Sequence, residues 1–470
     1  MMRGTSMLPG ASETIVAQAT AGARSALAVI RLSGPDAHRI GEALLSPWRA
    51  TPRAVYLAML RDPESGRDID RGIVTVYAAP ASYTGEDMIE LSLHGGEIGP
   101  ALAINALLAC GARSALPGEL TRRALLNGKL DLLQAEAIGD LIDARSRMMH
   151  DVALGQLAGH LSARLGTLRE EIIGLEALLA YDVDFPEEDD GPIAASRIEL
   201  ATRNIIASID ALLATASMGE MIRGGATVVI AGAPNAGKSS LFNALVGTQR
   251  AIVTDIPGTT RDALEAMIDI EQWPVRLVDT AGLRASEDVV ERLGIEVAER
   301  YVKDATVVMV CGEHVDSLSM GIASVRRLTD APLIAVGTKS DAEEISRDAI
   351  TALLSLHRAS GDLAYIAVSA RTGDGLAALA HAIAMLIQRN REPLSGDNPV
   401  LTRERHRVAL TRARSEVAAF LEIWTGLSGM PATLAAVHLH SARGSLEELV
   451  GVLDVEDVLD RVFSSFCVGK

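Results

Sequence analysis

Residues 232–239 of this chain read Gly-Ala-Pro-Asn-Ala-Gly-Lys-Ser, which is the pattern of a phosphate-binding loop. A β-branched run at 227–230 precedes it and an apolar run at 241–245 follows it, so the loop is predicted to join a strand to a helix. The glycines of such a loop let backbone N–H groups face a polyphosphate, while Lys238 supplies positive charge and Ser239 offers a hydroxyl to Mg²⁺. This segment restricts the middle of the chain to an α/β unit that binds a nucleotide.

Four more motifs follow the loop in the order typical of a GTPase. They are Thr-Thr-Arg-Asp at 259–262, Leu-Val-Asp-Thr-Ala-Gly at 277–282, Thr-Lys-Ser-Asp at 338–341 and Ser-Ala-Arg at 369–371. Within them, Asp279 can hold Mg²⁺ through water, Gly282 can place an N–H on the γ-phosphate, and Thr260 can complete the metal shell. The set predicts that the nucleotide is hydrolysed as well as bound.

The base motif favours GTP over ATP. The carboxylate of Asp341 suits the two N–H donors on the guanine edge, which adenine lacks. The usual Asn-Lys-x-Asp motif begins here with Thr338, a departure that weakens the expected grip on the base and spares the discriminating aspartate.

A second departure concerns hydrolysis. Leu283 follows Asp-Thr-Ala-Gly at the position where Ras-type enzymes place the glutamine that orients the attacking water. Since leucine cannot hydrogen-bond water, hydrolysis needs another orienting group and another source of positive charge.

The predicted GTP-binding residues cover five stretches of the chain. They are Asn235, Ala236, Gly237, Lys238, Ser239, Ser240, Thr254, Asp255, Ile256, Pro257, Gly258, Thr259, Thr260, Asp279, Thr280, Ala281, Gly282, Thr338, Lys339, Asp341, Ser369, Ala370 and Arg371.

Composition excludes several classes of protein. The 470 residues are 48% apolar and 22% charged, as in a globular chain of about three domains. Three scattered cysteines build neither a disulfide framework nor a cysteine zinc site. We find no signal-peptide pattern and no apolar run of about 20 residues, so we expect a cytoplasmic protein without a membrane partner.

The net charge of −17 argues against general nucleic-acid coating, so any RNA contact must be local. The basic cluster at 403–414 is one candidate for such a contact. It comprises Arg403, Arg405, His406, Arg407, Arg412 and Arg414. An ordinary solvated helix face is an equally good interpretation.

Hydrophobic spacing divides the chain into an α+β part, a helical part and an α/β insertion. Short strands are predicted at 15–19, 26–32, 73–77 and 88–93. A long amphipathic helix is predicted from Leu161, Leu165, Leu168, Ile172, Leu175 and Leu179. Helical patterning resumes near 401, so we expect the two helical flanks to pack on each other with the α/β part inserted between them. The acidic run at 187–190 is interpreted as a solvated connection.

Four stretches resemble one family across essentially the whole chain: the MnmE (TrmE) tRNA-modifying GTPases. They are Thr-Ile-Val-Ala-Gln-Ala-Thr at 14–20, the segment 84–96 with Thr-Gly-Glu-Asp and His-Gly-Gly, the segment 254–262, and Phe-Ser-Ser-Phe-Cys-Val-Gly-Lys at 463–470. The resemblance implies an α+β folate-binding and dimerisation domain over 1–128, a helical domain from 129–223 and 393–470, and a Ras-like P-loop GTPase domain over 224–392.

The resemblance also implies how hydrolysis proceeds without a glutamine. A K⁺ ion takes the place of an arginine finger when the GTPase domains of two subunits close on each other. The matching ligands here are Asn235, Thr254, Ile256 through its carbonyl, and Thr259, all oxygen donors as a hard cation requires. The family's water-orienting glutamate corresponds to Glu291, which from the residues alone reads as a helix-surface carboxylate.

For the ends of the chain the resemblance implies a pocket for 5-formyl- or 5,10-methylene-tetrahydrofolate. Residue matching assigns Arg31, Glu90, Lys129 and Lys470 to it, although isolated basic residues of this kind are usually solvated. Cys467 is a candidate catalytic group, with a redox role or a packed thiol as alternatives. The nearby aromatic residues Phe463 and Phe466 predict that the terminus docks on a neighbouring surface rather than forming a free tail.

The function expected from all this is a K⁺- and Mg²⁺-dependent, homodimeric GTPase. With the FAD-dependent partner MnmG it would place an aminomethyl or carboxymethylaminomethyl group on C5 of the wobble uridine, position 34, of certain tRNAs. A ribosome-assembly GTPase that acts as an RNA-binding switch shares the nucleotide motifs but leaves the N-terminal part and the Cys-Val-Gly-Lys end unexplained. A folate-dependent methylene transferase with a vestigial GTPase conflicts with the complete nucleotide motifs.

Overall fold

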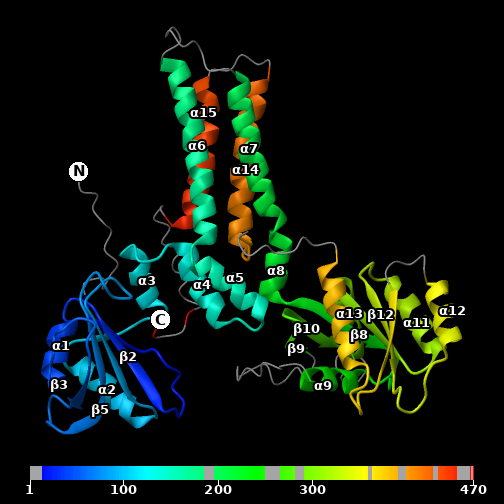
Figure 1. Cartoon of the computed structure of the whole chain (residues 1–470), viewed down its shortest axis with the longest axis horizontal. Coiled ribbons are helices and arrows are strands. Elements are labelled where there is room, and N and C mark those ends of the chain that lie inside the picture. The colour runs from blue at the N-terminus through cyan, green and yellow to red at the C-terminus, as the bar shows by residue number, and fades with distance from the viewer. Residues whose placement is uncertain are drawn as a thin grey trace. The chain divides into compact units, whose positions relative to one another are not determined.

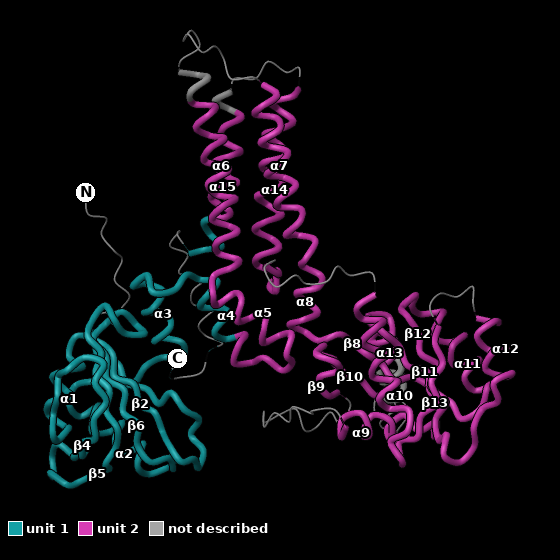
Figure 2. Tube along the Cα trace, in the orientation of Figure 1, with its two compact units in different colours: residues 1–139, 447–470 teal, residues 140–446 magenta. Residues whose placement is uncertain are grey.

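The structure is a computed structural model that describes residues 13–184, 195–248, 265–280, 290–357, 363–389, 399–426, 432–451, 466 and 469. The chain divides into two compact units, one of residues 1–139 with 447–470 and the other of residues 140–446 (Figure 2). The element order is drawn in Figure 1. The segment 187–190 lies outside the described residues.

The first unit is built on a sheet of seven described strands, in the order β3-β4-β5-β6-β2-β1-β7. The strands are β1 (Ile15–Gln18), β2 (Leu27–Ser33), β3 (Leu45–Ser46), β4 (Val55–Arg61), β5 (Asp68–Tyr77), β6 (Met88–His94) and β7 (Arg113–Ser114). Its helices are α1 (Ala37–Leu44), α2 (Ile98–Ala109), α3 (Glu119–Leu126) and α4 (Leu132–Ile142), the last of which runs into the second unit. All neighbours pair antiparallel except β1 and β7, which confirms an α+β arrangement.

One face of this sheet is packed and the other is open. Ile40 of α1 and Leu107 of α2 join Val74 and Leu91 of the sheet in one buried cluster. Side chains alternate between the two faces, so the residues between the buried ones in β4 and β5 are partly or fully exposed. The four strands expected from the sequence are present, and β4 and the two short strands β3 and β7 were missed.

The helical part of the second unit is formed by both flanks of the insertion. It consists of α5 (Arg147–Leu157), α6 (His160–Asp184), α7 (Ala195–Ala214), α8 (Ala216–Gly224), α14 (Glu404–Thr425) and α15 (Ala432–Val450). Helix α7 packs on α6 from its own flank and on α14 from the other, and Figure 1 shows the four long helices side by side. The six apolar positions predicted to mark one face of α6 are all buried. The expected packing of the two flanks is therefore confirmed.

Residues 195–224, which form α7 and α8, are long and apolar enough to cross a membrane by length and composition. The expectation that the chain has no such segment was therefore wrong. Ile198, Ile205 and Ile209 of this segment are buried, and the helix that carries them contacts both α6 and α14. We therefore interpret it as a core helix of the bundle, whose apolar stripe is covered by neighbouring helices.

The inserted part is a doubly wound α/β domain. Its described strands are β8 (Ala226–Gly232), β9 (Glu265–Ile270), β10 (Trp273–Asp279), β11 (Val307–Gly312), β12 (Leu333–Thr338) and β13 (Leu363–Val368), in the order β13-β12-β11-β8-β10-β9. Its helices are α9 (Lys238–Thr248), α10 (Val290–Lys303), α11 (Val315–Arg326), α12 (Arg347–Leu356) and α13 (Leu376–Gln388). All pairs are parallel except β9 with β10.

The strand order places the nucleotide motifs at one edge of this sheet. After the central strand β8, the chain forms β9 and β10 on one side of it and then crosses to β11 on the other side. Ligands of such sheets bind where the strand order reverses, beyond the carboxyl ends of the strands. The phosphate loop follows β8, Asp279 ends β10, Thr338 ends β12 and Ser369 follows β13. This is the topology of a Ras-like P-loop domain, as the sequence predicted.

The two connections between the insertion and the bundle lie beside each other. The backbone N–H of Leu401 donates to Thr215 Oγ1 at 3.1 Å, and Gln156 Nε2 donates to the carbonyl oxygen of Val400 at 2.9 Å. A Cβ added at Gly219 would lie 1.9 Å from the carbonyl oxygen of Leu401, so only glycine permits this approach. The α/β domain is therefore inserted between the two flanks of the helical part. The exact domain boundaries at 128/129, 223/224 and 392/393 stay predictions.

Candidate functional site

The phosphate loop has three residues with positive φ values. Gly232, at the end of β8, has a φ of 146°, and a Cβ there would lie 2.5 Å from the carbonyl oxygen of Cys311 on β11. Asn235 and Gly237 adopt positive φ values of 63° and 77°. Asparagine and glycine are the residues that tolerate this region best. The loop therefore turns tightly over the sheet and delivers the chain into α9.

Lys238 is buried inside this loop, with 7% of its surface exposed. Its ammonium donates hydrogen bonds to the carbonyl oxygens of Gly232 at 3.0 Å and Ala233 at 2.7 Å. A buried ammonium is costly unless it is well paired. The loop thus holds a positive charge at the N-terminus of a helix, which is a suitable site for phosphate oxygens.

Two hard oxygen donors lie together beside Lys238. The hydroxyl of Ser239 donates to Asp279 Oδ2 at 2.7 Å, although 40 residues separate them in the chain. Asp279 is buried at the end of β10, and Thr280 next to it donates through its hydroxyl to the carbonyl oxygen of Ile230 on β8. Hydroxyl and carboxylate oxygens are the ligands Mg²⁺ prefers, directly or through water, so this pair fits that ion.

The base motifs form a second group at the same edge. Asp341 Oδ1 accepts from the hydroxyl of Ser369 at 2.6 Å, and its Oδ2 accepts from the guanidinium of Arg371 at 2.8 Å. The Ser369 hydrogen bond, with a further contribution from Arg371, lowers the pKa of the Asp341 carboxyl below its ordinary value. Asp341 is therefore held as an oriented carboxylate, the form that can accept hydrogen bonds from a base edge.

A cavity of about 230 Å³ lies against Asp341 and the phosphate loop. Its lining residues are Gly237, Ser240, Leu241, Thr338, Lys339, Asp341, Ala342, Val368, Ala370 and Arg371. Predicted phosphate and base residues meet here from three different segments.

Thr338 and Lys339 close the inner side of this cavity. The hydroxyl of Thr338 is buried and has no hydrogen-bond partner among the described residues, and its side chain packs against Gly237 of the phosphate loop. Lys339 has a positive φ of 57° and forms an ion pair with Glu313 Oε1 at 2.5 Å.

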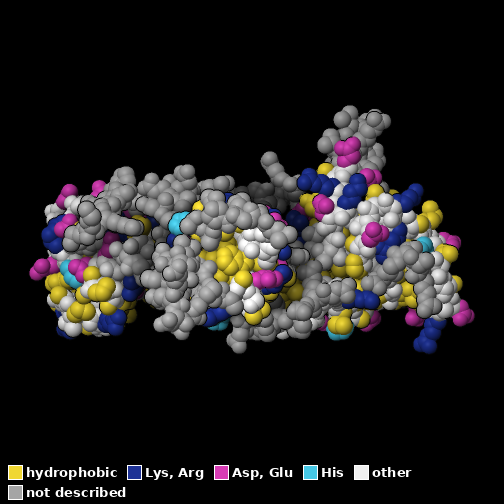
Figure 3. Space-filling model, turned by 90° about the horizontal axis from the view of Figure 1, so that it is seen from above, with side chains coloured by type: hydrophobic (Ala, Val, Ile, Leu, Met, Phe, Trp, Pro, Cys, Tyr) yellow, Lys and Arg dark blue, Asp and Glu magenta, His cyan; other side chains and the backbone are white. Residues whose placement is uncertain are grey.

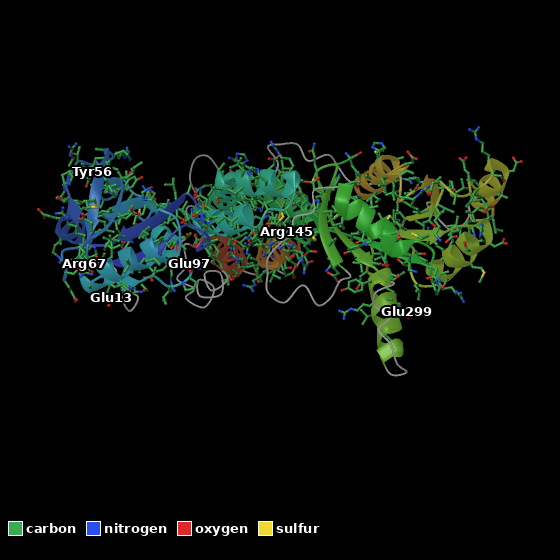
Figure 4. The ribbon with its side chains drawn as sticks, turned by 90° about the horizontal axis from the view of Figure 1, so that it is seen from below. Glu13, Tyr56, Arg67, Glu97, Arg145 and Glu299 are labelled. Atoms are coloured by element: carbon green, nitrogen blue, oxygen red, sulfur yellow. The ribbon has the colours of Figure 1, made fainter. Side chains whose placement is uncertain are left out.

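Several predicted site residues lie outside the described part of the chain. They are Thr254, Asp255, Ile256, Pro257, Gly258, Thr259, Thr260, Ala281, Gly282, Cys467 and Lys470. Glu291 lies in the first turn of α10, but its side chain is also outside the described residues. Helix α10, marked by Glu299 in Figure 4, stands out from the rest of the α/β domain.

A separate polar cluster lies on the open face of the sheet in the first unit. Arg31 of β2 and Glu90 of β6 face each other in the register, and Arg31 Nε donates to Glu90 Oε1 at 2.8 Å. The pair keeps 25% and 22% of its side-chain surface exposed. It is therefore accessible to a ligand and is not a buried structural pair.

Two tyrosines complete this cluster, and sequence reasoning missed both. The hydroxyl of Tyr77 donates to Glu90 Oε2 at 3.1 Å, and the Arg31 guanidinium lies 5.1 Å from the ring centre of Tyr83. Burial raises the pKa of both phenols above the ordinary value, with the Glu90 carboxylate adding to the shift at Tyr77, so both stay neutral donors. Tyr77 sits at the end of a predicted strand, and that position alone could have drawn attention to it.

Lys129, the third predicted folate residue, donates to the carbonyl oxygen of Pro80 at 3.0 Å, and no described hydrogen bond joins it to Glu90. Glu86, within the motif at 84–96, accepts from Ser33 and Arg123. That contact gives Glu86 a structural role in holding the loop.

The end of the chain docks on the first unit, as expected. Phe466 packs against the cluster of Leu132 and Ala135. Gly469 approaches the end of β1 so closely that a Cβ there would lie 2.0 Å from the carbonyl oxygen of Gln18. The terminal segment is therefore anchored at both of its described residues.

The basic cluster at 403–414 does not form a free basic surface. Arg403 pairs with Asp140, Arg407 with Glu404 and Arg414 with Asp210, while His406 is buried. In the described part of the face shown in Figure 3, Lys and Arg are interspersed with Asp and Glu. Most of these arginines therefore stabilise the bundle.

Comparison with known proteins agrees with this architecture. Residues 14–129 match the N-terminal domain of the GTP-binding protein TrmE, and residues 132–467 match the MnmE helical domain. The tRNA modification GTPase MnmE of Moorella thermoacetica is 39% identical over 469 residues, covering 97% of this chain and 99% of that protein. The MnmE of Acidiphilium cryptum is 42% identical over 464 residues, covering 98% and 99%.

Among solved structures, the G domain of the FeoB iron transporter of T. maritima is 26% identical and covers 35% of this chain and 99% of that chain, with a TM-score of 0.27. The helical-domain family spans more than half of the chain, and the two MnmE relatives match nearly all of it. The chain therefore belongs to the MnmE family and is a tRNA modification GTPase.

Proposed function

We propose that this GTPase modifies C5 of the wobble uridine of certain tRNAs, with GTP hydrolysis in one unit and one-carbon chemistry from a tetrahydrofolate in the other. The observation that carries the proposal is the presence of two separate polar sites in one chain. Lys238, Ser239, Asp279 and Asp341 gather at one sheet edge, while the Arg31–Glu90 pair lies on the open face of another sheet.

In the nucleotide site each residue has a distinct role. Lys238 and the N–H groups of the loop bind the outer phosphates, Ser239 and Thr260 ligate Mg²⁺, and Asp341 accepts from the guanine edge. The 2.7 Å contact between Ser239 and Asp279 supports a metal at this point, since both oxygens can face one ion.

Because position 283 holds leucine and not glutamine, hydrolysis needs another group to orient water and another source of positive charge. K⁺ would supply this charge, held by Asn235, Thr254, the carbonyl of Ile256, and Thr259. Asn235 fits this role because it is exposed on the phosphate loop in a left-handed conformation, which frees its amide oxygen from local helix contacts. Closure of two subunits would enclose the ion and exclude water.

GTP turnover should therefore depend on the alkali cation. Replacing Na⁺ by K⁺ at constant ionic strength should raise kcat by about tenfold or more, because a positive charge fixed at the leaving phosphoryl group stabilises the transition state. The measurement is phosphate release at saturating GTP, with Mg²⁺ held constant. Equal rates in the two salts would remove K⁺ from the mechanism.

Glu291 is proposed to orient the attacking water. Glu291→Ala should slow hydrolysis about a hundredfold and leave GTP affinity within about twofold, since the group acts on water and not on the nucleotide. Glu296→Ala, an exposed change on the same helix, is the matched control. A large loss of GTP affinity in the Glu291 variant would show that the residue is structural.

Thr338 is proposed to turn its hydroxyl toward the purine when GTP binds. The hydroxyl lacks a partner among the residues that the structure describes, and a rotation about χ1 exchanges it with the methyl group. Thr338 lines the same cavity as Gly237 and Asp341, and its donor would meet the imidazole side of the base, where N7 is the available acceptor.

Thr338→Val should therefore have opposite effects on the stability of the fold and on the affinity for GTP. Removing an unpaired buried hydroxyl should leave the free energy of unfolding unchanged or raise it, while GTP affinity should fall about three- to tenfold. 7-Deaza-GTP, which lacks the N7 acceptor, should bind both proteins equally. If the variant discriminates between GTP and 7-deaza-GTP as the wild type does, Thr338 does not contact N7.

The folate site is proposed on the open sheet face of the first unit. Arg31 and Glu90 provide a donor and acceptors for a pterin edge and its carboxylate tail, while the Tyr77 hydroxyl orients Glu90 and the Tyr83 ring lies beside Arg31. Tetrahydrofolate, when bound, would supply the one-carbon unit. Lys129 and Lys470 are proposed to bind its tail, and Cys467 stays a candidate for a catalytic role.

Arg31→Ala should weaken binding of 5-formyl-tetrahydrofolate about tenfold or more, the amount expected for losing a charge-assisted hydrogen bond. Calorimetric titration measures this affinity, and GTP turnover should stay unchanged. Arg61→Ala is the matched control, because Arg61 forms an exposed pair with Asp68 on the same sheet. Unchanged folate affinity in the Arg31 variant would place the folate elsewhere.

The same open face supports the proposed homodimer. Val55, Leu57 and Ile73 are exposed apolar side chains on β4 and β5, and Leu57 lies directly opposite Ile73. A second copy that covered them would bury apolar surface and shield the folate from water. The FAD-dependent MnmG, tRNA and a cytoplasmic location complete the proposal. The two partners derive from the family resemblance, and the location derives from the composition, with its three scattered cysteines.

A further inference from the structure

The first backbone N–H groups of α5 are not satisfied within their own helix. The first N–H groups of any α-helix lack an intrahelical partner and need other acceptors. Ser146 caps the helix by accepting from the N–H of Met149 at 3.1 Å. The two groups before it are bound by the inserted domain, since Arg147 N–H donates to Asp269 Oδ2 at 3.2 Å and Met148 N–H donates to the carbonyl oxygen of Gln272 at 3.4 Å.

Both acceptors lie at the tight turn between β9 and β10: Asp269 is the second-last residue of β9, and Gln272 is in the turn itself. Ile270 pairs with Trp273, so Glu271 and Gln272 form a two-residue loop, with φ values of 47° and 77°. Turns with two positive φ values normally use Asn and Gly, so this turn needs support. Asp269 provides it, because its Oδ1 accepts from the N–H of Gln272 at 2.8 Å. One carboxylate thus shapes the turn and binds α5.

Apolar packing reinforces this contact. Met148 of α5 and Met218 of α8 each pack against the core of the α/β domain and also against a smaller cluster that includes Met149, Ile222 and Val400. In Figure 4, the labelled residue Arg145, which precedes α5 in the chain, lies beside the α/β domain.

The turn is linked to the nucleotide site by a single rigid strand. β10 runs from Trp273, next to the turn, to Asp279, which accepts from Ser239. It is paired with β8 on one side and β9 on the other. A rise of about 3.3 Å per residue separates the first and last residues of this seven-residue strand by roughly 20 Å.

We propose that the β9–β10 turn is the joint that holds the nucleotide-binding domain on the helical bundle, and that Asp269 is its positioning residue for tRNA modification. Movement of β10 at the metal site reaches α5 through Asp269 and Gln272. GTP binding and hydrolysis use residues at the other end of the strand and do not require the joint. The part of this inference that concerns tRNA rests on the proposed function.

The test compares Asp269→Ala with the wild-type chain by amide hydrogen exchange in the region of residues 145–150. Loss of the carboxylate should speed exchange at Arg147 about two- to fivefold, the range expected for a charge at a helix N-terminus. Asp269→Asn retains one acceptor oxygen and should give an intermediate rate. GTP affinity and turnover should stay near the wild-type values, while modified wobble uridine formed per GTP hydrolysed should fall.

Two variants serve as controls. Glu271→Ala changes the neighbouring acid of the same turn, which contacts His381 of α13 rather than α5, and should alter neither amide exchange nor coupling. Ser146→Ala weakens the cap from within the helix and should speed exchange at Met149 while Asp269 still protects Arg147.

An unchanged rate of amide hydrogen exchange at Arg147 in the Asp269→Ala variant would overturn the proposal that the β9–β10 turn is the joint. A parallel loss of GTP turnover and tRNA modification would also overturn it, because Asp269 would then act on the nucleotide site itself. If the wild-type chain did not modify wobble uridine, the proposed function would fail, while amide exchange would still decide whether the joint exists.

Discussion

The nucleotide site depends on one backbone constraint, namely that parallel strands end at the same edge of a sheet. β8, β10, β12 and β13 come from distant parts of the chain, yet their carboxyl ends bring Lys238, Asp279, Thr338 and Ser369 together. The phosphate loop then adds a buried ammonium and free helix N–H groups at that edge. A site of this kind needs little side-chain adjustment, because the sheet sets most of its geometry.

The helical bundle presents the opposite situation, in which neither flank of the chain is complete alone. Helix α7 packs on α6 of its own flank and also on α14, which returns after the insertion, and Arg443 of α15 forms an ion pair with Glu176 of α6. The two connections are tied by Thr215 and Gln156, so the inserted domain leaves and re-enters the bundle at one place. The nucleotide domain therefore contacts the bundle close to α5 and α8.

Charge is used mainly for internal structure. The chain carries a net charge of −17, and the arginines that seemed most suited to RNA form ion pairs with Asp140, Glu404 and Asp210. Partly exposed ion pairs of this kind contribute modestly to stability. Two of the three join α14 or its N-cap to another helix: the N-cap Arg403 pairs with Asp140 of α4, and Arg414 pairs with Asp210 of α7. Contact with a tRNA would then need a limited surface or surface from a partner, and not a general positive field.

The sequence alone was sufficient for the local features. Periodicity located α6 and four strands of the first unit, and the spacing of glycine, lysine and aspartate identified the GTPase, because such motifs require particular residue types at particular positions. It did not reveal β4 or the partners of the basic cluster, since these depend on which segments pack together in the fold. The apolar composition of residues 195–224 was present in the sequence and was overlooked, and only the packing of α7 shows that its apolar face is covered.

Only the tertiary structure placed Tyr77 and Tyr83 beside Arg31 and Glu90, left the Thr338 hydroxyl without a partner in the described part of the chain, and brought Asp269 to the start of α5. These contacts join segments far apart in the chain. Their geometry is set by strand register and helix packing, which no local pattern of residues encodes.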